Sequence, residues 1–146
     1  MRISAITESG EGEHRVALTP EAAQKLVSDG HTVTIESGAG AAIGALDNDY
    51  RDAGALIADN RAGAIAAADL VASINHGHVD DLPGLDERHT LVALLDPLWR
   101  PEPMTAIAAT GATALSLELV PRITRAQSMD VLSSMATVAG YQAVLT

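Results

Sequence analysis

The sequence predicts an α/β domain in which helices pack on both faces of a parallel β-sheet. Short apolar runs rich in Val and Ile alternate with segments of helical periodicity, and turn-forming Gly or Pro residues separate many of them. Phe is absent from the 146 residues, so the core must be built from Ala, Val, Leu and Ile, which suits close packing of helices on a sheet. Together these observations favour a three-layer, flavodoxin- or Rossmann-like fold.

The first predicted helix has the clearest boundaries. Thr19 offers an N-cap hydroxyl, Pro20 suits the first helical position and Glu21 lies in the first turn. Ala and Leu residues at helical spacing follow, and Gly30 marks the end of the pattern.

The other elements keep the alternation of strand and helix. We expect longer strands at residues 2–7, 31–36, 69–74, 90–95 and 112–117. A shorter strand is expected at residues 53–58, and further helices at residues 60–67, 102–110 and 129–144. Neither a linker nor an internal repeat interrupts the pattern, so residues 1–146 are expected to form one domain.

The charge and the composition exclude several classes of function. A formal charge of −10 disfavours binding to nucleic acid and to anionic membrane surfaces. The absence of Cys excludes disulfides, thiolate metal sites and thiol catalysis. The sequence contains neither a signal-peptide pattern nor an apolar stretch of membrane-spanning length, so a cytoplasmic protein is expected.

A parallel sheet with helices on both faces binds ligands at the carboxyl ends of its strands. The segments expected at that edge are residues 8–15, 37–44, 75–78, 96–99 and the loop that begins with Arg122. The functional groups should therefore be sought in these segments.

The glycine-rich run at residues 38–44, GAGAAIG, resembles a dinucleotide-binding fingerprint only superficially. It follows the second predicted strand instead of opening a βαβ unit, and no acidic residue ends a following strand at the usual spacing. We favour the simpler interpretation, a turn with close backbone packing.

Two histidines and two carboxylates lie near the end of the 69–74 strand. His76, His78, Asp80 and Asp81 are residue types that bind zinc, but two His separated by one glycine do not complete a coordination shell. We favour a solvated loop here and expect no metal site.

The segment between the last strand and the last helix has the richest set of polar side chains. Two cations, an amide, two hydroxyls and a carboxylate fall within twelve residues: Arg122, Arg125, Gln127, Ser128, Asp130 and Ser133. Such a set can bind a polar planar ligand. The alternative is a solvated connection in which Ser128 caps the last helix.

Two long segments resemble a known family. ELVPRITRAQSMDVLSSMATVAGYQAV, near the C-terminal end, is similar to a segment of the NAD(H)-binding alpha subunit (domain I) of proton-translocating nicotinamide nucleotide transhydrogenase. GEHRVALTPEAAQKLVSDGHTVTIESGAG, near the start, is similar to the opening that this subunit shares with alanine dehydrogenase. The resemblance covers most of the chain, and it is stronger to the transhydrogenase subunit than to alanine dehydrogenase.

The resemblance implies roles for four residues. Arg122, Gln127, Asp130 and Ser133 match the transhydrogenase residues that surround the nicotinamide of NAD(H). It implies that Arg122 and Ser133 fix the carboxamide and its neighbouring groups, and that Asp130 orders the loop. Gln127 would reach toward the NADP(H) of a partner domain. Arg122, Gln127 and Asp130 are accordingly the expected catalytic residues, and all four the expected cofactor-binding residues.

Departures from alanine dehydrogenase argue against amino-acid chemistry. The Arg that binds the substrate carboxylate in those enzymes matches Arg15, a weak candidate anion site here. Their Lys and His positions fall at Asn75 and near Asp96, which supply no comparable proton-transfer group. An ion pair of Arg15 with Glu11, Glu13 or Glu36 is an equally good interpretation of that residue.

The resemblance also sets expectations about the rest of the protein. In this family NAD(H) lies between the N-terminal lobe and a Rossmann domain that has no counterpart in the sequence. The chain alone is therefore expected to be inactive and to bind nucleotide weakly or not at all. The implied partners are the NADP(H)-binding domain, a membrane subunit that would place the protein at the inner membrane, and a second copy in a homodimer. The alternatives are an alanine-dehydrogenase-like oxidoreductase lobe and a non-catalytic binding module.

Overall fold

A parallel β-sheet forms the centre of the protein, which we describe from a computed structural model covering residues 1–75 and 79–145. Within those residues the strands are β1 (Arg2–Ala5), β2 (Thr32–Glu36), β3 (Leu56–Ala58), β4 (Leu70–Asn75), β5 (Thr90–Leu94) and β6 (Thr113–Ser116). Neighbouring strands pair in the order β3-β2-β1-β4-β5-β6, and all pairs are parallel. This is the Rossmann strand order. After β3 the chain crosses back to the other side of β1 and continues with β4, so the strand order reverses between β1 and β4, where such folds bind ligands.

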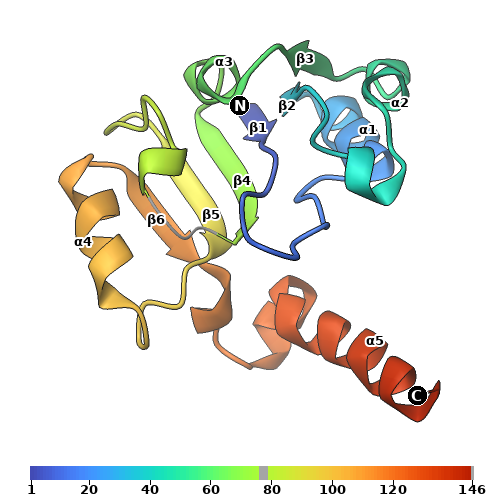
Figure 1. Ribbon diagram of the computed structural model, residues 1–146, viewed down its shortest axis with the longest axis vertical. Coiled ribbons are helices and arrows are strands. Elements are labelled where there is room, and N and C mark those ends of the chain that lie inside the picture. Colours follow the sequence, from blue (N-terminus) through green and yellow to red (C-terminus); the bar gives the residue numbers. More distant parts are fainter. Residues whose placement is uncertain (76–78, 146) are drawn as a thin grey trace.

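Helices cover the sheet on both faces, which confirms the predicted fold class (Figure 1). The helices of the body are α1 (Pro20–Ser28), α2 (Asp47–Asp52), α3 (Arg61–Ala66) and α4 (Pro101–Ala109). Ala5 packs with residues of α1 and α2, whereas Ile6 packs with residues of α3 and α4. Ala5 ends β1 and Ile6 follows it in extended sequence, so their side chains point to opposite faces of the sheet, and these two clusters are the cores of the two faces.

The first helix forms for the reasons that the sequence suggests. The Thr19 hydroxyl accepts the Ala22 N–H at 3.3 Å, and Pro20 occupies the first turn. Gly30, with φ of 87°, follows the helix in the left-handed conformation that favours glycine.

Short elements account for most differences from the predicted pattern. Helix α2 lies in a segment expected to be irregular, and its N-terminus is satisfied by the Asp49 carboxylate, which accepts the Leu46 N–H at 2.7 Å. Within the described residues, four 3₁₀ helices were also not predicted: η1 (Ala41–Ile43), η2 (Val79–Asp81), η3 (Leu117–Leu119) and η4 (Thr124–Met129). Elements of three to six residues are too short to produce a periodic pattern.

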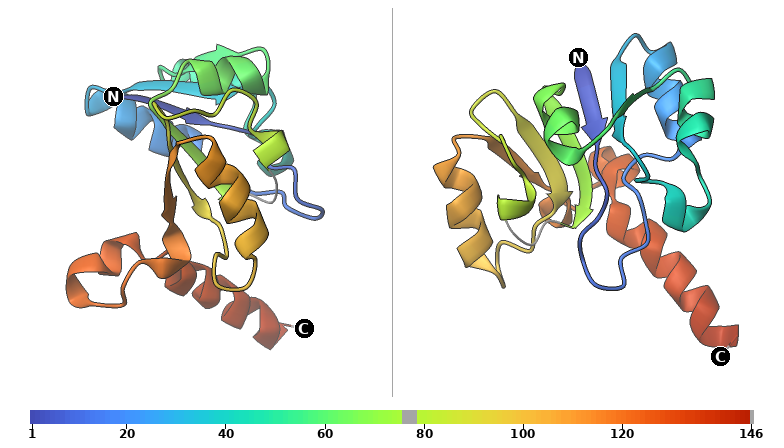
Figure 2. Two further views of the ribbon diagram at one scale, coloured as in Figure 1. Left: turned by 90° about the vertical axis from the view of Figure 1, so that its left-hand side faces the viewer. Right: turned by 45° about the horizontal axis from the view of Figure 1, so that its top comes forward.

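The last helix, α5 (Val131–Leu145), extends away from the sheet in every view (Figures 1 and 2). Its existence was predicted, but it starts two residues later than expected. Its apolar side chains are largely exposed, including Val138 at 62% and Tyr141 at 70%. No helix within residues 1–75 and 79–145 combines the length and the apolar character needed to cross a membrane.

Candidate functional site

The polar segment between β6 and α5, residues 121–133, forms an exposed bend at the carboxyl edge of the sheet (Figure 2). Pro121 follows η3, and η4 forms the middle of the bend. The Asp130 carboxylate accepts the backbone N–H groups of Leu132 (3.1 Å) and Ser133 (2.9 Å), so Asp130 caps α5. The alternative that Ser128 is the cap is therefore wrong.

Three of the four predicted residues form one hydrogen-bonded cluster. The Ser133 hydroxyl donates to Asp130 Oδ2 at 2.7 Å, and Arg122 Nη2 donates to Ser133 Oγ at 3.1 Å. Arg122 Nε lies 3.6 Å from Asp130 Oδ2. These contacts lower the pKa of Asp130: the Ser133 hydroxyl contributes most, followed by the Ser133 N–H, with a smaller contribution from the positive charge of Arg122.

The residues of the bend line a cavity of about 280 Å³ that is open to solvent. Its lining contains all four residues predicted to bind the cofactor, Arg122, Gln127, Asp130 and Ser133. The structure therefore brings them together, although their roles stay a prediction. Arg125 and Ser128 belong to the same bend but are not among the residues that line the cavity.

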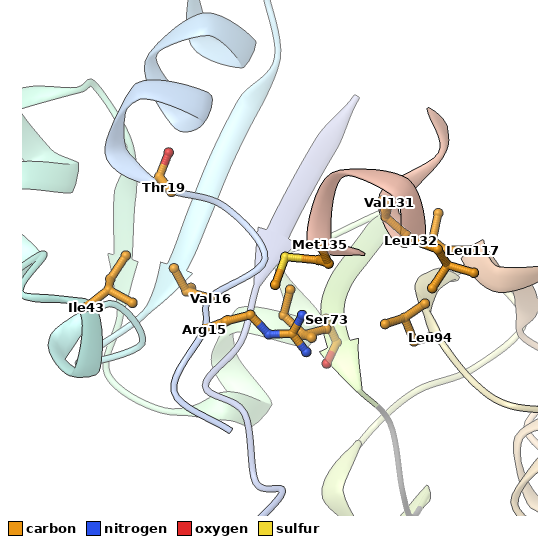
Figure 3. A pocket seen from close by; sticks show the side chains of 11 residues that line it. Arg15, Val16, Thr19, Ile43, Ser73, Leu94, Leu117, Val131, Leu132 and Met135 are labelled. Atoms are coloured by element: carbon orange, nitrogen blue, oxygen red, sulfur yellow. The ribbon is translucent and has the colours of Figure 1, made fainter. Parts of the chain in front are cut away.

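A second and larger cavity of about 400 Å³ lies between the start of α5 and the ends of β4 and β5 (Figure 3). Ser73 and Ile74 of β4 and Leu94 of β5 bring it to the carboxyl edge of the sheet, beside the point where the strand order reverses. The other lining residues are Arg15, Val16, Thr19, Ile43, Leu117, Val131, Leu132 and Met135. Most of this wall is apolar, in contrast to the polar bend.

Sequence reasoning missed the second cavity. Leu132 and Met135 fit an ordinary apolar helical pattern, yet they are 45% and 42% exposed and face the cavity. The signal that could have revealed it is the set of apolar residues at strand ends, Ile74, Leu94 and Leu117, at an edge where polar side chains are usual.

Arg15 lies at the second cavity, not in the bend. Its Nε donates to Glu13 Oε1 at 2.8 Å and its Nη2 to Glu13 Oε2 at 2.6 Å, so of the three ion pairs considered the one with Glu13 forms. Asn75 Nδ2 also donates to Glu13 Oε2, at 2.6 Å. The role of Arg15 as an anion site stays a prediction.

The Glu13 ion pair gives the protein a pH-dependent stability. Hydrogen bonding from Arg15 lowers the pKa of Glu13 from 4.5 to about 2. Because the folded pKa is depressed, the contribution is complete above pH 4.5 and is lost as the pH falls toward 2. We expect Glu13→Gln to cost about 1–2 kcal/mol of unfolding free energy at pH 7, a value reduced for solvent screening of the partly exposed Arg15.

Urea unfolding of both proteins at pH 7 and pH 3 measures this effect. The difference between wild type and Glu13→Gln should shrink at pH 3. An equal difference at both pH values would show that the charge of Glu13 does not stabilise the fold.

The glycine-rich loop after β2 supports the interpretation as a close-packed turn. The Asp47 carboxylate accepts the Gly38 N–H at 2.8 Å and the Ser37 hydroxyl at 2.7 Å, so a protein carboxylate takes the donors that a phosphate would need. A Cβ atom on Gly40 would lie 2.6 Å from the Tyr50 hydroxyl oxygen and 2.7 Å from the Ala45 carbonyl oxygen.

The candidate metal ligands His76 and His78 lie outside the described residues. Their neighbour Asp81 accepts a hydrogen bond from the Ser9 hydroxyl at 2.9 Å. Among the residues that the structure describes, no group of three or more His, Cys, Asp or Glu side chains is placed to bind a metal ion.

Asp96, at the position near which alanine dehydrogenases have a His, has φ of 51° and an exposed side chain. Its N–H and that of Leu95 both donate to Glu118 Oε1, which joins the ends of β5 and β6. Because Glu118 belongs to η3, these hydrogen bonds also hold η3, which precedes the bend, at the carboxyl edge of the sheet.

Comparisons with known proteins agree on one family. Residues 5–139 match the family model described as the alanine dehydrogenase/PNT N-terminal domain. The NAD(P) transhydrogenase subunit alpha of Cereibacter sphaeroides is 40% identical over 145 residues, which are 99% of this chain and 28% of that protein. Alanine dehydrogenase of Bacillus subtilis is 31% identical over 98% of this chain and 37% of its own length.

A solved structure gives the same result. The transhydrogenase from Sinorhizobium meliloti superimposes with a TM-score of 0.92 at 39% identity, covering 99% of this chain and 43% of that one. An L-alanine dehydrogenase reaches a TM-score of 0.73 over 82% of this chain at 31% identity. The chain thus spans between about a quarter and under half of the relatives it matches. It belongs to the alanine dehydrogenase/PNT N-terminal domain family, on the transhydrogenase side of that family.

Proposed function

We propose that residues 1–146 act as the N-terminal lobe of the NAD(H)-binding subunit of a proton-translocating transhydrogenase. In this proposal the bend orients the nicotinamide of NADH for direct hydride transfer to NADP⁺ on a partner domain. The observation that carries it is the convergence of Arg122, Gln127, Asp130 and Ser133 on one open cavity.

The donors of the bend suit a nicotinamide. Arg122 and Gln127 supply N–H groups, and Ser133 supplies a hydroxyl, for the carbonyl oxygen of a carboxamide or the oxygens of a ribose. Asp130 accepts hydrogen bonds, and its bonds to the Ser133 hydroxyl and backbone fix the first turn of α5. The Arg122 side chain is 75% exposed, so its guanidinium can donate to a ligand while its Nε stays beside the Asp130 carboxylate.

The residues of the bend are equipped for orientation, not for proton transfer. The nucleotide itself supplies the hydride, so the protein has to place two rings face to face and exclude water. Neither a Lys nor a His occurs between residues 121 and 133. A site made of one guanidinium, an amide, a hydroxyl and a carboxylate is sufficient for that task.

Alanine oxidation requires a proton-transfer group, which the residues at the two matching positions, Asn75 and Asp96, do not supply. Asn75 occupies the lysine position and donates to Glu13, while Asp96 lies near the histidine position with its side chain in solvent. The alanine dehydrogenases are also less similar in sequence and in structure than the transhydrogenases.

Further components of the proposal come from the longer relatives. We propose that NAD(H) lies between this lobe and a Rossmann domain, and that an NADP(H)-binding domain docks at the bend. A homodimer on the cytoplasmic side of the membrane, attached through other subunits, completes the assembly. The exposed apolar side chains of α5 support burial of this helix against further protein.

Gln127 provides the test of the orientation role. A chimaera that joins residues 1–146 to the remainder of the Cereibacter sphaeroides subunit, assembled with its other subunits, allows hydride transfer to be measured. Gln127→Asn shortens the side chain by one methylene, which should misplace the two rings. We expect hydride transfer to slow about tenfold or more with NADH affinity changed less than about twofold, because small misplacements act mainly on the reaction step.

Stopped-flow transfer rates and NADH titrations measure the two quantities separately. Gln24→Asn, at an exposed position of α1, is the matched control and should leave both unchanged. An unchanged transfer rate in Gln127→Asn would remove Gln127 from the proposed role.

A further inference from the structure

Glu118 extends the contact between β5 and β6 beyond the end of their pairing. The two strands pair as far as Ala93 and Ser116. Two residues later, Glu118 Oε1 accepts the backbone N–H of Leu95 at 2.9 Å and also that of Asp96. The side chain thus binds N–H groups of the chain that follows β5, and it holds η3 against that end of the sheet.

The backbone hydrogen bonds of the bend are local. Four N–H groups donate to carbonyls two or three residues earlier in the chain, those of Val120, Ile123, Ala126 and Asp130. At the far end of the bend, the Arg122–Ser133 hydrogen bond and the bonds between Asp130 and Ser133 join it to α5. These bonds give the bend its shape but do not tie it to the sheet. The two hydrogen bonds of Glu118 supply such a tie at the start of the bend.

Two unusual features meet at this tie. Glu118 Oε2 is buried without a hydrogen-bond partner in the described part of the chain, which is rare for a carboxylate oxygen. Asp96 has φ of 51°, a left-handed conformation that is unfavourable for residues other than glycine. The Asp96 carbonyl also accepts the N–H groups of Trp99 at 3.2 Å and Arg100 at 2.8 Å, which closes the turn before α4. Unfavourable local arrangements of this kind persist mainly where a functional element has to be held in one place.

We propose that Glu118 is a positioning residue: it fixes the bend relative to the sheet, so that a nicotinamide held by the bend faces the second nucleotide at the reacting distance. The inference rests on the function proposed for the bend. Glu118 is not among the residues that line the cavity of the bend, so it acts through the backbone that leads to Arg122 and not by contact with NADH. Without this tie the bend keeps its own hydrogen bonds and still binds NADH, but the ring is no longer held in one position.

Three substitutions in the chimaera test the proposal through the transfer rate and the NADH affinity. Glu118→Ala removes the acceptor and Glu118→Asp shortens it by one methylene. Both should slow hydride transfer at saturating NADH about tenfold or more, with NADH affinity changed less than about threefold. Glu118→Gln keeps an acceptor oxygen at the same reach, so it should restore the rate to within about threefold of wild type. Circular dichroism at the assay temperature verifies that each variant is folded, and a residue that only stabilised the fold would leave all three rates unchanged.

The position of the bend can also be measured in the 146-residue chain, without reference to the proposed function. Because the sequence contains no Cys, nitroxide labels can be attached at Arg125→Cys in the bend and Glu102→Cys in α4, both exposed positions. Electron paramagnetic resonance then gives the distribution of the distance between the labels. It should be narrow with Glu118 or Glu118→Gln, and it should broaden with Glu118→Ala and Glu118→Asp.

Three results would overturn the proposal: unchanged transfer in Glu118→Ala and Glu118→Asp, transfer as slow in Glu118→Gln as in Glu118→Ala, or a distance distribution that no substitution alters. Gln127→Asn separates this failure from that of the proposed function. If Gln127→Asn slows transfer and Glu118→Ala does not, the bend orients the nicotinamide without the help of Glu118. If neither slows transfer, the function proposed for the bend is itself wrong.

Discussion

Arg122→Ala should weaken NADH binding to the chimaera by about ten- to a hundredfold, the range expected when a charged hydrogen-bond donor is lost from a binding site. Arg122 lines the cavity of the bend and donates to the Ser133 hydroxyl. Its loss removes one ligand donor and also frees Ser133 and Asp130 from their positively charged neighbour. The affinity for NADH should fall more than the transfer rate at saturating NADH, because the contacts proposed for Arg122 are with the bound NADH, whereas Gln127 reaches toward the second nucleotide.

Arg125→Ala is the matched control for this prediction. Arg125 lies in the same bend, three residues away, and carries the same charge, but it is exposed and is not among the residues that line the cavity. The two variants have equal net charge, so a general electrostatic attraction of NADH would affect both equally. NADH titration by fluorescence should show less than about a twofold change for Arg125→Ala. Equal losses in both variants would contradict a specific role for Arg122.

Gly40→Ala should lower the free energy of unfolding by about 1–3 kcal/mol, the range for overpacking of a buried site. The added methyl would lie within 3 Å of the Tyr50 hydroxyl and the Ala45 carbonyl, and Tyr50 is fully buried with its hydroxyl bonded to the Leu18 carbonyl at 2.9 Å. A displaced Tyr50 would lose this hydrogen bond and disturb the core cluster that it forms with Ala23 of α1. Gly40 has φ of −90°, so the cost is steric and not conformational.

Gly63→Ala is the control for the glycine prediction. Gly63 lies in α3, and a Cβ atom there would meet its nearest neighbours at 3.5 and 3.8 Å, which is ordinary contact. Alanine should therefore leave stability unchanged or raise it by up to about 1 kcal/mol through helix propensity. Urea midpoints of the two variants give the comparison, and similar midpoints would show that the turn relaxes around the added methyl.

The regular part of the fold was predictable because each long element has a local signal. The strands before and after α1 are short β-branched runs, and α1 has a complete set of N-terminal residues in Thr19, Pro20 and Glu21. Helix α2 was missed because it has six residues and is closed at its start by Asp49, three positions beyond Leu46. The strand order also has no local signal, since it depends on pairing between strands that are far apart in the sequence.

The candidate site was predictable in part, and for a different reason. The residues of the bend lie within twelve positions of each other, so one segment with a family resemblance was enough to group them. The second cavity joins residues from Arg15 to Met135, and no local pattern links positions so far apart. The hydrogen bond between Asn75 and Glu13 has the same origin, because β4 meets the first loop only in the folded chain. The ion pair of Glu13 with Arg15 is local, and the sequence offered it as one of three possible pairs.

A crystal structure of the chimaera with bound NADH tests the central proposal most directly. The account predicts that the nicotinamide lies in the cavity of the bend, with Arg122, Ser133 or both within about 3 Å of its carboxamide or ribose oxygens. Gln127 should stand at the open side of the ring, where a second nucleotide would approach. A nicotinamide bound against the loop at residues 37–47, or one with no contact to residues 121–133, would contradict it.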